Sequence, residues 1–410
     1  MRKLGLSFAA ALLLGACAPS QTLTHLNAYP APSVPVKDVV LDNLKSPWSI
    51  AFITDTDVLI SEKGGHLLRA DLEGKNTSII EGFPGDVANE TAGEDYAGGN
   101  NGIFDVLLDP DFSNNQYIYV AYSARQEAAY TTKIIRGRLT GNVLSDVETL
   151  FVAAPYTENE TFHYGGGMVF GTDGKLYVTI GERLYSEENQ PPIPIAQNLA
   201  DRRGKIYRFN PDGSIPADNP DFGEGAVPGM YAAGIRAAQG LTVHPKTGEI
   251  WFSEHGTYRG DEINKLTAGA NYGWPIHTTG DYRYGDYDPP KMEERTFTPP
   301  VWYWRHTVAP TGLTFYSGDE FPQWEGDLLV PGLSIGSLWR VNFEDGAIIG
   351  LETLMTNDRV RTRKVAQSPN GTLYMLADTH LTITPGVGVT DNGGPDGQLI
   401  RIRNAAFKGQ

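Results

Sequence analysis

Six short apolar segments recur along the chain, and their spacing restricts the possible folds more than any other feature. Each segment is an apolar strand, then a turn with Pro, Asp or Gly, then a second apolar strand. Successive first strands are separated by between 52 and 73 residues, and they lie at 48–52, 104–108, 167–170, 240–243, 312–315 and 364–367. Repeats of this length with several strands each are typical of propeller blades. The sequence therefore predicts an all-β fold, a six-bladed β-propeller.

The two ends of the folded part are expected to close this ring. The strand PVKDVVLDNL (35–44) and the strand GQLIRIR (397–403) would share one blade. The 47 Gly and 27 Pro residues leave little room for long helices. A two-sheet sandwich is the alternative, but a sandwich would not repeat at this spacing. We assign the propeller to residues 36–410.

The first residues have the pattern of a bacterial lipoprotein leader. Two cations and an apolar run precede Leu-Gly-Ala-Cys, which predicts a signal peptide over 1–16, a lipidated Cys17 and a tether over 17–35. Cys17 is the single cysteine, so the folded part contains no disulfide. The net charge of −16 argues against binding to nucleic acid or anionic lipid. We therefore expect a protein of the bacterial cell envelope, held to the membrane only by its lipid anchor.

Polar residues flank the six repeats at equivalent positions. Those that precede the first strands are Lys45, Asn100, His163, Arg236, Thr307, Arg361 and Arg363. Those that end the second strands are Glu62, Glu182, Glu254 and Asp378. An inner strand leaves one face of a propeller and its neighbour returns to that face, so both sets are predicted to meet at one mouth of the central channel. A ring of mixed charge around a concave mouth indicates a binding site, although such loops are polar in any propeller.

His163 is the candidate general base of this mouth. A neutral imidazole accepts a proton near neutral pH, and Glu182 at the end of the same hairpin is placed to orient it. Three glycines, 165–167, follow and are expected to let a ligand approach the backbone closely. His255 is a second candidate with less support. The alternative is a rim histidine without a catalytic task.

The loop 256–262, GTYRGDE, supplies carbonyls and two carboxylates. These are the hard oxygen ligands that Ca²⁺ prefers, so the loop is a candidate Ca²⁺ site. An acidic turn without metal has the same composition. The sequence leaves both interpretations open.

Longer motifs carry a family resemblance from about Val36 to Arg403. The best-matching motifs, which are specific together, are SPWSIAF, LLDPDFSNNQYIYVAYS, GKLYVTIGE, GKIYRFNPDGSIPADNP, SEHGTYRGDEIN, GANYGWP, HTVAPTGL and SPNGTLYMLAD. With these motifs the chain resembles the soluble PQQ-dependent glucose and aldose-sugar dehydrogenases, the glucose/sorbosone dehydrogenase family, where PQQ is pyrroloquinoline quinone. The resemblance implies a six-bladed propeller with the quinone over the channel mouth.

The resemblance also implies roles for individual residues. His163 occupies the place of the base that takes the sugar hydroxyl proton while hydride passes to the quinone. The residues that match cofactor-contacting positions are Arg236, Thr307, Arg361 and Arg363, with Asn100 in place of a family glutamine. The implied ligands of Ca²⁺ are the carbonyls of Gly256 and Thr257 for the cofactor's ion, and Asp261, Glu262 and Tyr272 for a second, structural ion.

The chain departs from the family pattern at several positions. A cofactor-binding lysine falls on Ser334, and an asparagine after Arg236 is Ala237. PQQ is a tricarboxylate whose affinity depends on cations, and Lys45 and Lys364 are the candidates to replace the lost lysine.

These observations lead to one expectation and two alternatives. The expected function is oxidation of aldose sugars or related hydroxyl groups with PQQ and Ca²⁺, in which the protein positions the cofactor that does the chemistry. The alternatives are a Ca²⁺-dependent lactonase-type hydrolase and a propeller that binds glycans or a partner without catalysis. The sequence does not identify the sugar or the electron acceptor.

Overall fold

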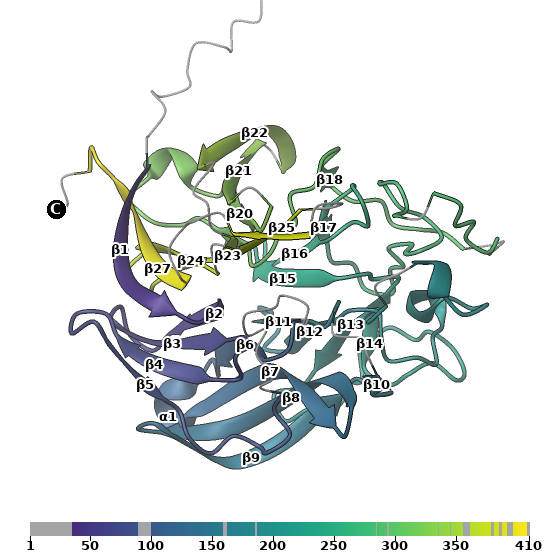
Figure 1. Ribbon diagram of the computed structural model, residues 1–410, viewed down its shortest axis with the longest axis horizontal. Helices are drawn as coiled ribbons and strands as arrows, with labels where there is room; N and C mark the ends of the chain where they lie inside the picture. Colours follow the sequence, from purple (N-terminus) through teal and green to yellow (C-terminus); the bar gives the residue numbers. More distant parts are fainter. Residues whose placement is uncertain are drawn as a thin grey trace, which may run out of the picture. The chain divides into compact units, whose positions relative to one another are not determined.

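The computed structural model contains six sheets arranged in a ring, as Figure 1 shows. It describes residues 35–88, 100–158, 162–184, 187–283, 285–292, 295–334, 336–344, 346–355, 361–378, 381–384, 388–391 and 397–407. The signal peptide, Cys17 and nearly all of the tether (17–34) lie outside the described residues. The predicted six-bladed β-propeller is confirmed.

In each of blades I to V, the first strand of the blade lies innermost. Blade I consists of β2 (Pro47–Phe52), β3 (Asp57–Glu62), β4 (Leu67–Asp71) and β5 (Asn76–Ile79). Blade II consists of β6 (Ile103–Leu108), β7 (Tyr117–Gln126), β8 (Ala129–Thr140) and β10 (Thr157–Glu158), with β9 (Val143–Val152) also paired to β8. Blade III consists of β11 (Gly165–Phe170), β12 (Leu176–Ile180), β13 (Lys205–Phe209) and β14 (Met230–Ala233).

The second half of the ring follows the same plan. Blade IV consists of β15 (Ala238–Val243), β16 (Ile250–Glu254), β17 (Glu262–Lys265) and β18 (Trp302–Tyr303). Blade V consists of β19 (Thr314–Phe315), β20 (Leu328–Gly332), β21 (Ser337–Glu344) and β22 (Ala347–Met355). Blade VI consists of β23 (Thr362–Gln367), β24 (Leu373–Ala377), β27 (Gly397–Asn404) and β1 (Pro35–Leu44). All six apolar segments singled out in the sequence supply the innermost strands.

Blade VI closes the ring with strands from both ends of the described chain. β1 pairs antiparallel with β27, from Pro35 opposite Asn404 to Leu44 opposite Gly397. β27 in turn pairs with β24. The prediction that 35–44 and 397–403 share a blade is therefore confirmed.

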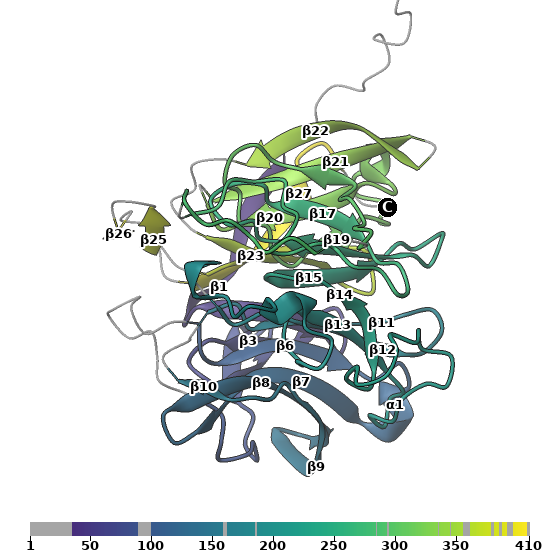
Figure 2. The ribbon, with the colours of Figure 1, turned by 90° about the vertical axis from the view of Figure 1, so that its right-hand side faces the viewer.

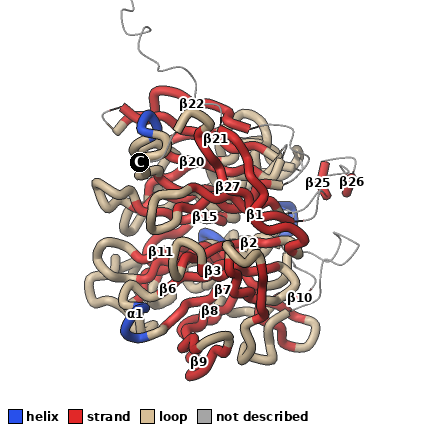
Figure 3. The backbone as a smooth tube through the Cα atoms, turned by 90° about the vertical axis from the view of Figure 1, so that its left-hand side faces the viewer, coloured by secondary structure: helices blue, strands red, loops and turns tan. Residues whose placement is uncertain are grey.

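Little helix accompanies the strands in the described part of the chain, as the colouring of Figure 3 shows. There is one short α-helix, α1 (Phe112–Asn115), and the 3₁₀ turns include η2 (Glu187–Asn189), η3 (Ile195–Gln197) and η4 (Pro322–Trp324). The hairpin β25 (Leu381–Thr384) and β26 (Gly388–Asp391) forms a separate two-stranded sheet that stands out from the ring in Figure 2. Within the described residues we find no helix of the length and apolarity needed to cross a membrane.

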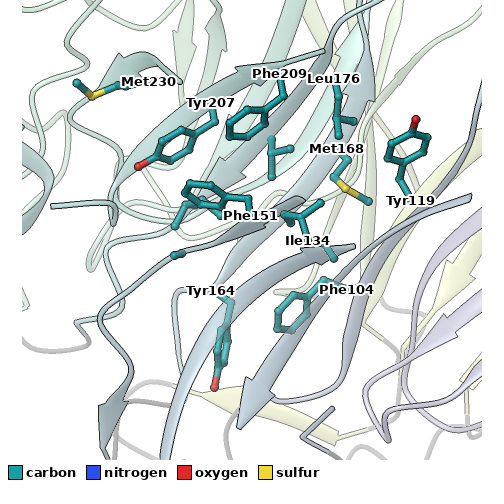
Figure 4. Close-up of a cluster of buried hydrophobic side chains, with 14 of the residues drawn as sticks. Phe104, Tyr119, Ile134, Phe151, Tyr164, Met168, Leu176, Tyr207, Phe209 and Met230 are labelled. Carbon is teal, nitrogen blue, oxygen red and sulfur yellow. The ribbon is translucent and has the colours of Figure 1, made fainter. Parts of the chain in front are cut away.

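The core lies between neighbouring blades because each sheet buries both of its faces. Figure 4 shows the cluster shared by blades II and III, in which Phe104 packs on Tyr164 at 5.0 Å between ring centroids and Phe151 packs on Tyr207 at 4.4 Å. Each buried aromatic side chain contributes about 1.5–3 kcal/mol to stability. Tyr164 directly follows His163, so this core fixes the backbone beside the candidate base.

The inner strands share a bulge near the mouth of the channel. The pairing of first and second strand shifts by one residue in five blades, at Pro47/Ser49, Ile103/Asp105, Gly165/Met168, Ala238/Gly240 and Thr362/Lys364. A bulge re-aims the side chains around it. The repeated bulge lies where the chain passes from the polar mouth into the packed strands.

Candidate functional site

The ends of the second strands bury four carboxylates around the channel mouth. Glu62, Glu182, Glu254 and Asp378 are each at most 5% exposed. Burying a carboxylate costs several kcal/mol unless cations or donors accompany it. The structure places such partners beside each of the carboxylates described below, and together they form the candidate site.

His163 and Glu182 are brought together as the sequence predicts. The imidazole Nδ1 lies 3.8 Å from Glu182 Oε1, and the histidine side chain is 11% exposed. Gln190 Nε2 donates to Glu182 Oε2 at 2.7 Å and holds the carboxylate in place. The pair is thus a buried imidazole with an oriented carboxylate, the arrangement of a general base and its positioning group.

The backbone at His163 is held in an unfavourable conformation. Its φ is +51°, which costs a non-glycine residue about 1–2 kcal/mol. The following residue offsets this, because the Tyr164 ring is buried, its hydroxyl bonds Asn101 Oδ1, and Thr132 Oγ1 donates to its carbonyl at 2.8 Å. The guanidinium of Arg183 stacks on the same ring at 3.5 Å and donates to the carbonyl of Phe162 at 2.7 Å. His163 is therefore clamped from both sides.

The glycines after His163 have a different task from the one predicted. A Cβ on Gly165 would lie 2.7 Å from Thr179 O, and one on Gly167 would lie 2.7 Å from Gln239 O in the next blade. A Cβ on Gly166 would meet the Phe104 ring at 2.8 Å. The expectation that they clear space for a ligand is wrong. They allow neighbouring backbones to pack closely at the narrow centre of the propeller.

The protonation states at this pair suit a base. Burial, with Arg236, His255 and Arg283, lowers the pKa of His163 well below its usual value, so the imidazole is neutral at pH 7. Burial raises the pKa of Glu182 to about 7, although Arg236 acts in the opposite direction. A neutral base beside a carboxylate that titrates near neutrality can accept a proton and stabilise the resulting charge.

Arg236 is buried and held above the ring of Trp274. Its Cζ lies 5.1 Å from the ring centroid, its Nη1 donates to Gly256 O at 2.6 Å, and its backbone N–H donates to a Glu254 carboxylate oxygen. Its Nε and Nη2 are buried and make no hydrogen bond among the described residues. The Nε2 of the nearby His255 is also buried and makes no hydrogen bond among the described residues. Burial, and secondly the positive charge of Arg236, lower the pKa of His255 to about 3.

A second group of cations surrounds Asp378. Its Oδ2 lies 2.7 Å from Arg363 Nη2, 3.5 Å from Lys63 Nζ and 3.7 Å from Arg361 Nε. Burial alone would raise the pKa of Asp378, but Lys63 and the two arginines hold it well below its usual range. Burial, partly opposed by Asp378, lowers the pKa of Lys63 to about 7. Three cationic side chains thus meet at one carboxylate.

Sequence reasoning missed Lys63. Of the two lysines proposed as replacements for the family lysine, Lys45 is exposed and Lys364 lies within the channel, 3.5 Å from Asp105. Lys63 directly follows Glu62, a residue that the repeat pattern placed at the mouth. Its position next to Glu62 is therefore the one sequence feature that indicates a place for Lys63 at the mouth.

Two of the proposed cofactor-contacting residues lie at the edge of the mouth. Thr307 Oγ1 donates to Tyr258 O at 2.8 Å, and Asn100 is half-buried. Ser334 lies in the turn after β20, where its N–H donates to Val308 O at 3.1 Å.

The loop 256–262 is built around Asp261. Its carboxylate accepts the backbone N–H groups of Gly256 at 2.8 Å, Val308 at 2.6 Å and Ala309 at 2.7 Å, so it ties the loop to blade V. The two carbonyls implied as Ca²⁺ ligands accept from guanidinium groups, Gly256 O from Arg236 and Thr257 O from Arg283 at 3.4 Å. The guanidinium groups of Arg236 and Arg283 therefore occupy the carbonyls that a Ca²⁺ ion would need.

Two other carboxylates meet on its far side. Glu254 and Glu262 are directly opposite each other in the β16–β17 pairing and line a small cavity with Tyr272. Burial, followed by the charge of Glu262, raises the pKa of Glu254 to about 8. The Tyr272 hydroxyl donates to Lys265 O at 2.6 Å. Among the described residues, no three His, Cys, Asp or Glu side chains form a metal-binding group, so a cation here would also need carbonyl or water oxygens.

The mouth as a whole has donors and acceptors that the described chain does not satisfy. Besides Arg236 and His255, Glu187 Oε2 and Tyr287 OH are buried there without a hydrogen bond. Buried polar atoms in this state indicate a missing ligand or water. The free donors of Arg236, together with the cations around Asp378, suit an anionic and polar molecule of the PQQ kind.

Comparisons with known proteins agree on one family. The family model described as glucose/sorbosone dehydrogenase matches residues 44–383. The aldose sugar dehydrogenase of Escherichia coli K12 is 33% identical over 359 residues, covering 85% of this chain and 92% of the relative. The quinoprotein glucose dehydrogenase B of Acinetobacter calcoaceticus is 28% identical over 443 residues, covering 89% and 90%.

Solved structures give the same result. The apo form of the E. coli soluble aldose sugar dehydrogenase matches with a TM-score of 0.76 and 31% identity, over 90% of this chain and 99% of that one. The PQQ-bound aldose sugar dehydrogenase of Streptomyces coelicolor matches in fold, with a TM-score of 0.68 and 24% identity, over 91% and 99%. The resemblance found in the sequence motifs is confirmed.

Proposed function

Because this chain belongs to the glucose/sorbosone dehydrogenase family, we propose that it uses PQQ to oxidise aldose sugars or related hydroxyl groups at the propeller mouth. The observation that carries the proposal is the neutral, buried His163 beside Glu182, at a mouth that also holds two groups of buried cations. The names of the relatives, a sugar dehydrogenase and a quinoprotein, support the substrate class and the cofactor.

The two groups of cations would make different contacts with the cofactor. Lys63, Arg361 and Arg363 would bind carboxylates, since charge-assisted hydrogen bonds are about twice as strong as neutral ones. Arg236 would donate through its unsatisfied Nε and Nη2. When bound, the quinone supplies a two-electron acceptor for the hydride of the substrate C–H bond.

The protein's own contribution is proton transfer and positioning. His163, which is neutral at pH 7, would take the proton of the substrate hydroxyl. Burial makes it a weaker base than a free imidazole, so the imidazolium needs a stabilising partner. Ionised Glu182 would stabilise the imidazolium that results. The backbone clamp on both sides of His163 keeps the imidazole aimed at the mouth.

We also propose a structural Ca²⁺ site between β16 and β17, where Glu262 at the end of the loop 256–262 faces Glu254. The cross-strand pair of Glu254 and Glu262 fits a divalent cation, because two like charges opposite each other are destabilising without one. Gly256 and Thr257 fit a cation less well, since guanidinium groups bond both carbonyls. No catalytic step is assigned to Ca²⁺.

Reconstitution tests the proposed function. The purified apo-protein is mixed with PQQ and Ca²⁺, binding is followed by quinone absorbance, and aldose-dependent dye reduction is measured. Wild type should be active, and His163→Ala should lose about 10²–10⁴-fold in rate. His244→Ala is the matched control, since His244 caps the turn at the opposite end of β15–β16. A wild type that neither binds PQQ nor reduces dye contradicts the proposal. Lactone hydrolysis without quinone would favour the hydrolase alternative.

A further inference from the structure

The turn η2 between β12 and β13 directs two side chains into the site. Gln190, which follows the turn, donates to Glu182 as described above. Glu187, the first residue of the turn, is 1% exposed although it belongs to a polar loop. A carboxylate is almost never buried to this degree unless its oxygens are used.

Only one of the Glu187 oxygens is used by the described chain. Oε1 accepts a hydrogen bond from Thr257 Oγ1, and Thr257 Oγ1 accepts one from the Arg283 backbone N–H at 3.0 Å. Oε2 is buried and has no hydrogen-bond partner. Leaving such an acceptor unsatisfied is costly, so Oε2 needs a partner that the described chain does not supply, either a ligand or a water.

The surroundings of Glu187 belong to the candidate site. Its charge acts on Glu182, Arg236, Tyr282 and Tyr287, so these groups lie in its neighbourhood. Tyr287 OH is also buried without a hydrogen bond. The rings of Tyr282 and Tyr287 meet edge to face at 5.0 Å and remain partly exposed.

The chemistry of this wall matches a polyhydroxylated ligand. Glu187 Oε2 needs a donor, Tyr287 OH can donate or accept, and the two rings offer apolar faces. Sugar hydroxyls supply donors and acceptors on neighbouring carbons, and the C–H faces of a sugar ring pack on aromatic rings. A metal ion fits less well, because the guanidinium groups of Arg236 and Arg283 approach the adjacent carbonyls.

We infer that Glu187 is a specificity-determining residue for the sugar. Its Oε2 accepts a hydrogen bond from a substrate hydroxyl other than the one that is oxidised, beside the wall formed by Tyr282 and Tyr287. This inference rests on the proposed function. A site built to bond a hydroxyl discriminates strongly against the analogue that lacks it, because the buried group is then left unsatisfied.

The test uses the PQQ-loaded enzyme with Glu187→Gln. The glutamine can still accept from Thr257 through its oxygen, but its NH₂ group replaces the acceptor that faces the sugar. Glu188→Gln is the matched control, since Glu188 is the next residue of the same turn and is exposed. KM and kcat are measured for an aldose and for its single-deoxy analogues, together with PQQ affinity and thermal midpoint.

We expect Glu187→Gln to raise KM for the aldose roughly 10- to 100-fold, as expected when a hydrogen bond to a charged group is lost. For one deoxy analogue, wild type and variant should have the same KM, which identifies the hydroxyl that Glu187 binds. PQQ affinity should be unchanged.

Two results would overturn the inference while leaving the proposed function in place. One is an active Glu187→Gln enzyme with wild-type KM for every analogue, which would mean that water satisfies Oε2. The other is a loss that tracks weaker PQQ binding, which would make Glu187 a cofactor-site residue. A wild type with no PQQ-dependent activity removes the proposed function itself, and the inference with it.

Discussion

Replacing Lys63 by methionine should weaken PQQ binding without unfolding the protein. Lys63 Nζ lies 3.5 Å from Asp378, but Arg363 lies closer to the same carboxylate, at 2.7 Å. Asp378 therefore keeps a charged partner in Lys63→Met. A hydrogen bond to a charged group contributes about 1.5–3 kcal/mol, so the PQQ dissociation constant should rise roughly 10- to 150-fold.

The pH dependence of binding makes this prediction specific to Lys63. Burial lowers the pKa of this lysine to about 7, so the unliganded side chain loses its charge as the pH rises above 7. The carboxylates of PQQ favour the charged form, which raises the lysine pKa on binding. PQQ affinity should be highest below pH 7 and should fall by up to about tenfold per pH unit above it.

The assay is an equilibrium PQQ titration between pH 6 and 9, read by quinone absorbance or by quenching of the tryptophan fluorescence, to which Trp48, 5.6 Å from Lys63 Nζ, contributes. Lys45→Met is the matched control, because Lys45 is exposed. Lys63→Met should lose both the affinity and the decline above pH 7. Wild-type affinity with an unchanged pH profile in Lys63→Met would refute the reasoning.

Three further predictions follow from the same structure. Burial raises the pKa of Glu182 to about 7, and its ionised form is needed to stabilise the imidazolium, so kcat/KM should rise as the pH passes through about 7. Glu182→Gln should abolish this rise. An identical pH profile in the variant would exclude the proposed role of Glu182. The pKa of Glu254 is about 8 in the folded state and lower in the unfolded state, so the thermal midpoint of the metal-free protein should fall as the pH rises towards 8. Ca²⁺ should restore the midpoint in wild type but not in Glu254→Gln. If a chelator leaves the wild-type midpoint unchanged, the loop is an acidic turn that binds no Ca²⁺. Wild type should partition with membranes, and Cys17→Ser should be released at high salt, since acyl chains contribute about 0.8 kcal/mol per buried CH₂; a Cys17→Ser protein still on membranes would contradict lipidation.

The sequence predicts the inner strands well because their burial leaves a direct mark. Segments such as 48–52 and 104–108 are apolar since both faces of an inner strand are covered, and their spacing sets the number of blades. The same spacing brings His163 and Glu182 to one place. For His163 and Glu182, the position in the sequence repeat is enough to predict the position at the channel mouth.

Other parts of the site depend on contacts that a single sequence does not reveal. Glu187 belongs to a run that has the composition of a solvated loop, and its burial arises from packing against Thr257 of the next blade. Lys63 follows a strand end, and its role appears only when blade VI brings Asp378 beside it. The packing role of the glycines at 165–167 cannot be predicted from the local sequence, because the groups that crowd them come from other strands.

The pairing of β1 with β27 has a consequence for how the protein is made. Residues 35–44 leave the ribosome early, yet their partner strand ends at Asn404. Until then β1 is an open edge that invites pairing with other chains. Blade VI, which carries Arg361, Arg363 and Asp378, is consequently the last to form. Affinity for an anionic ligand at the mouth would therefore appear only after β27 has paired with β1.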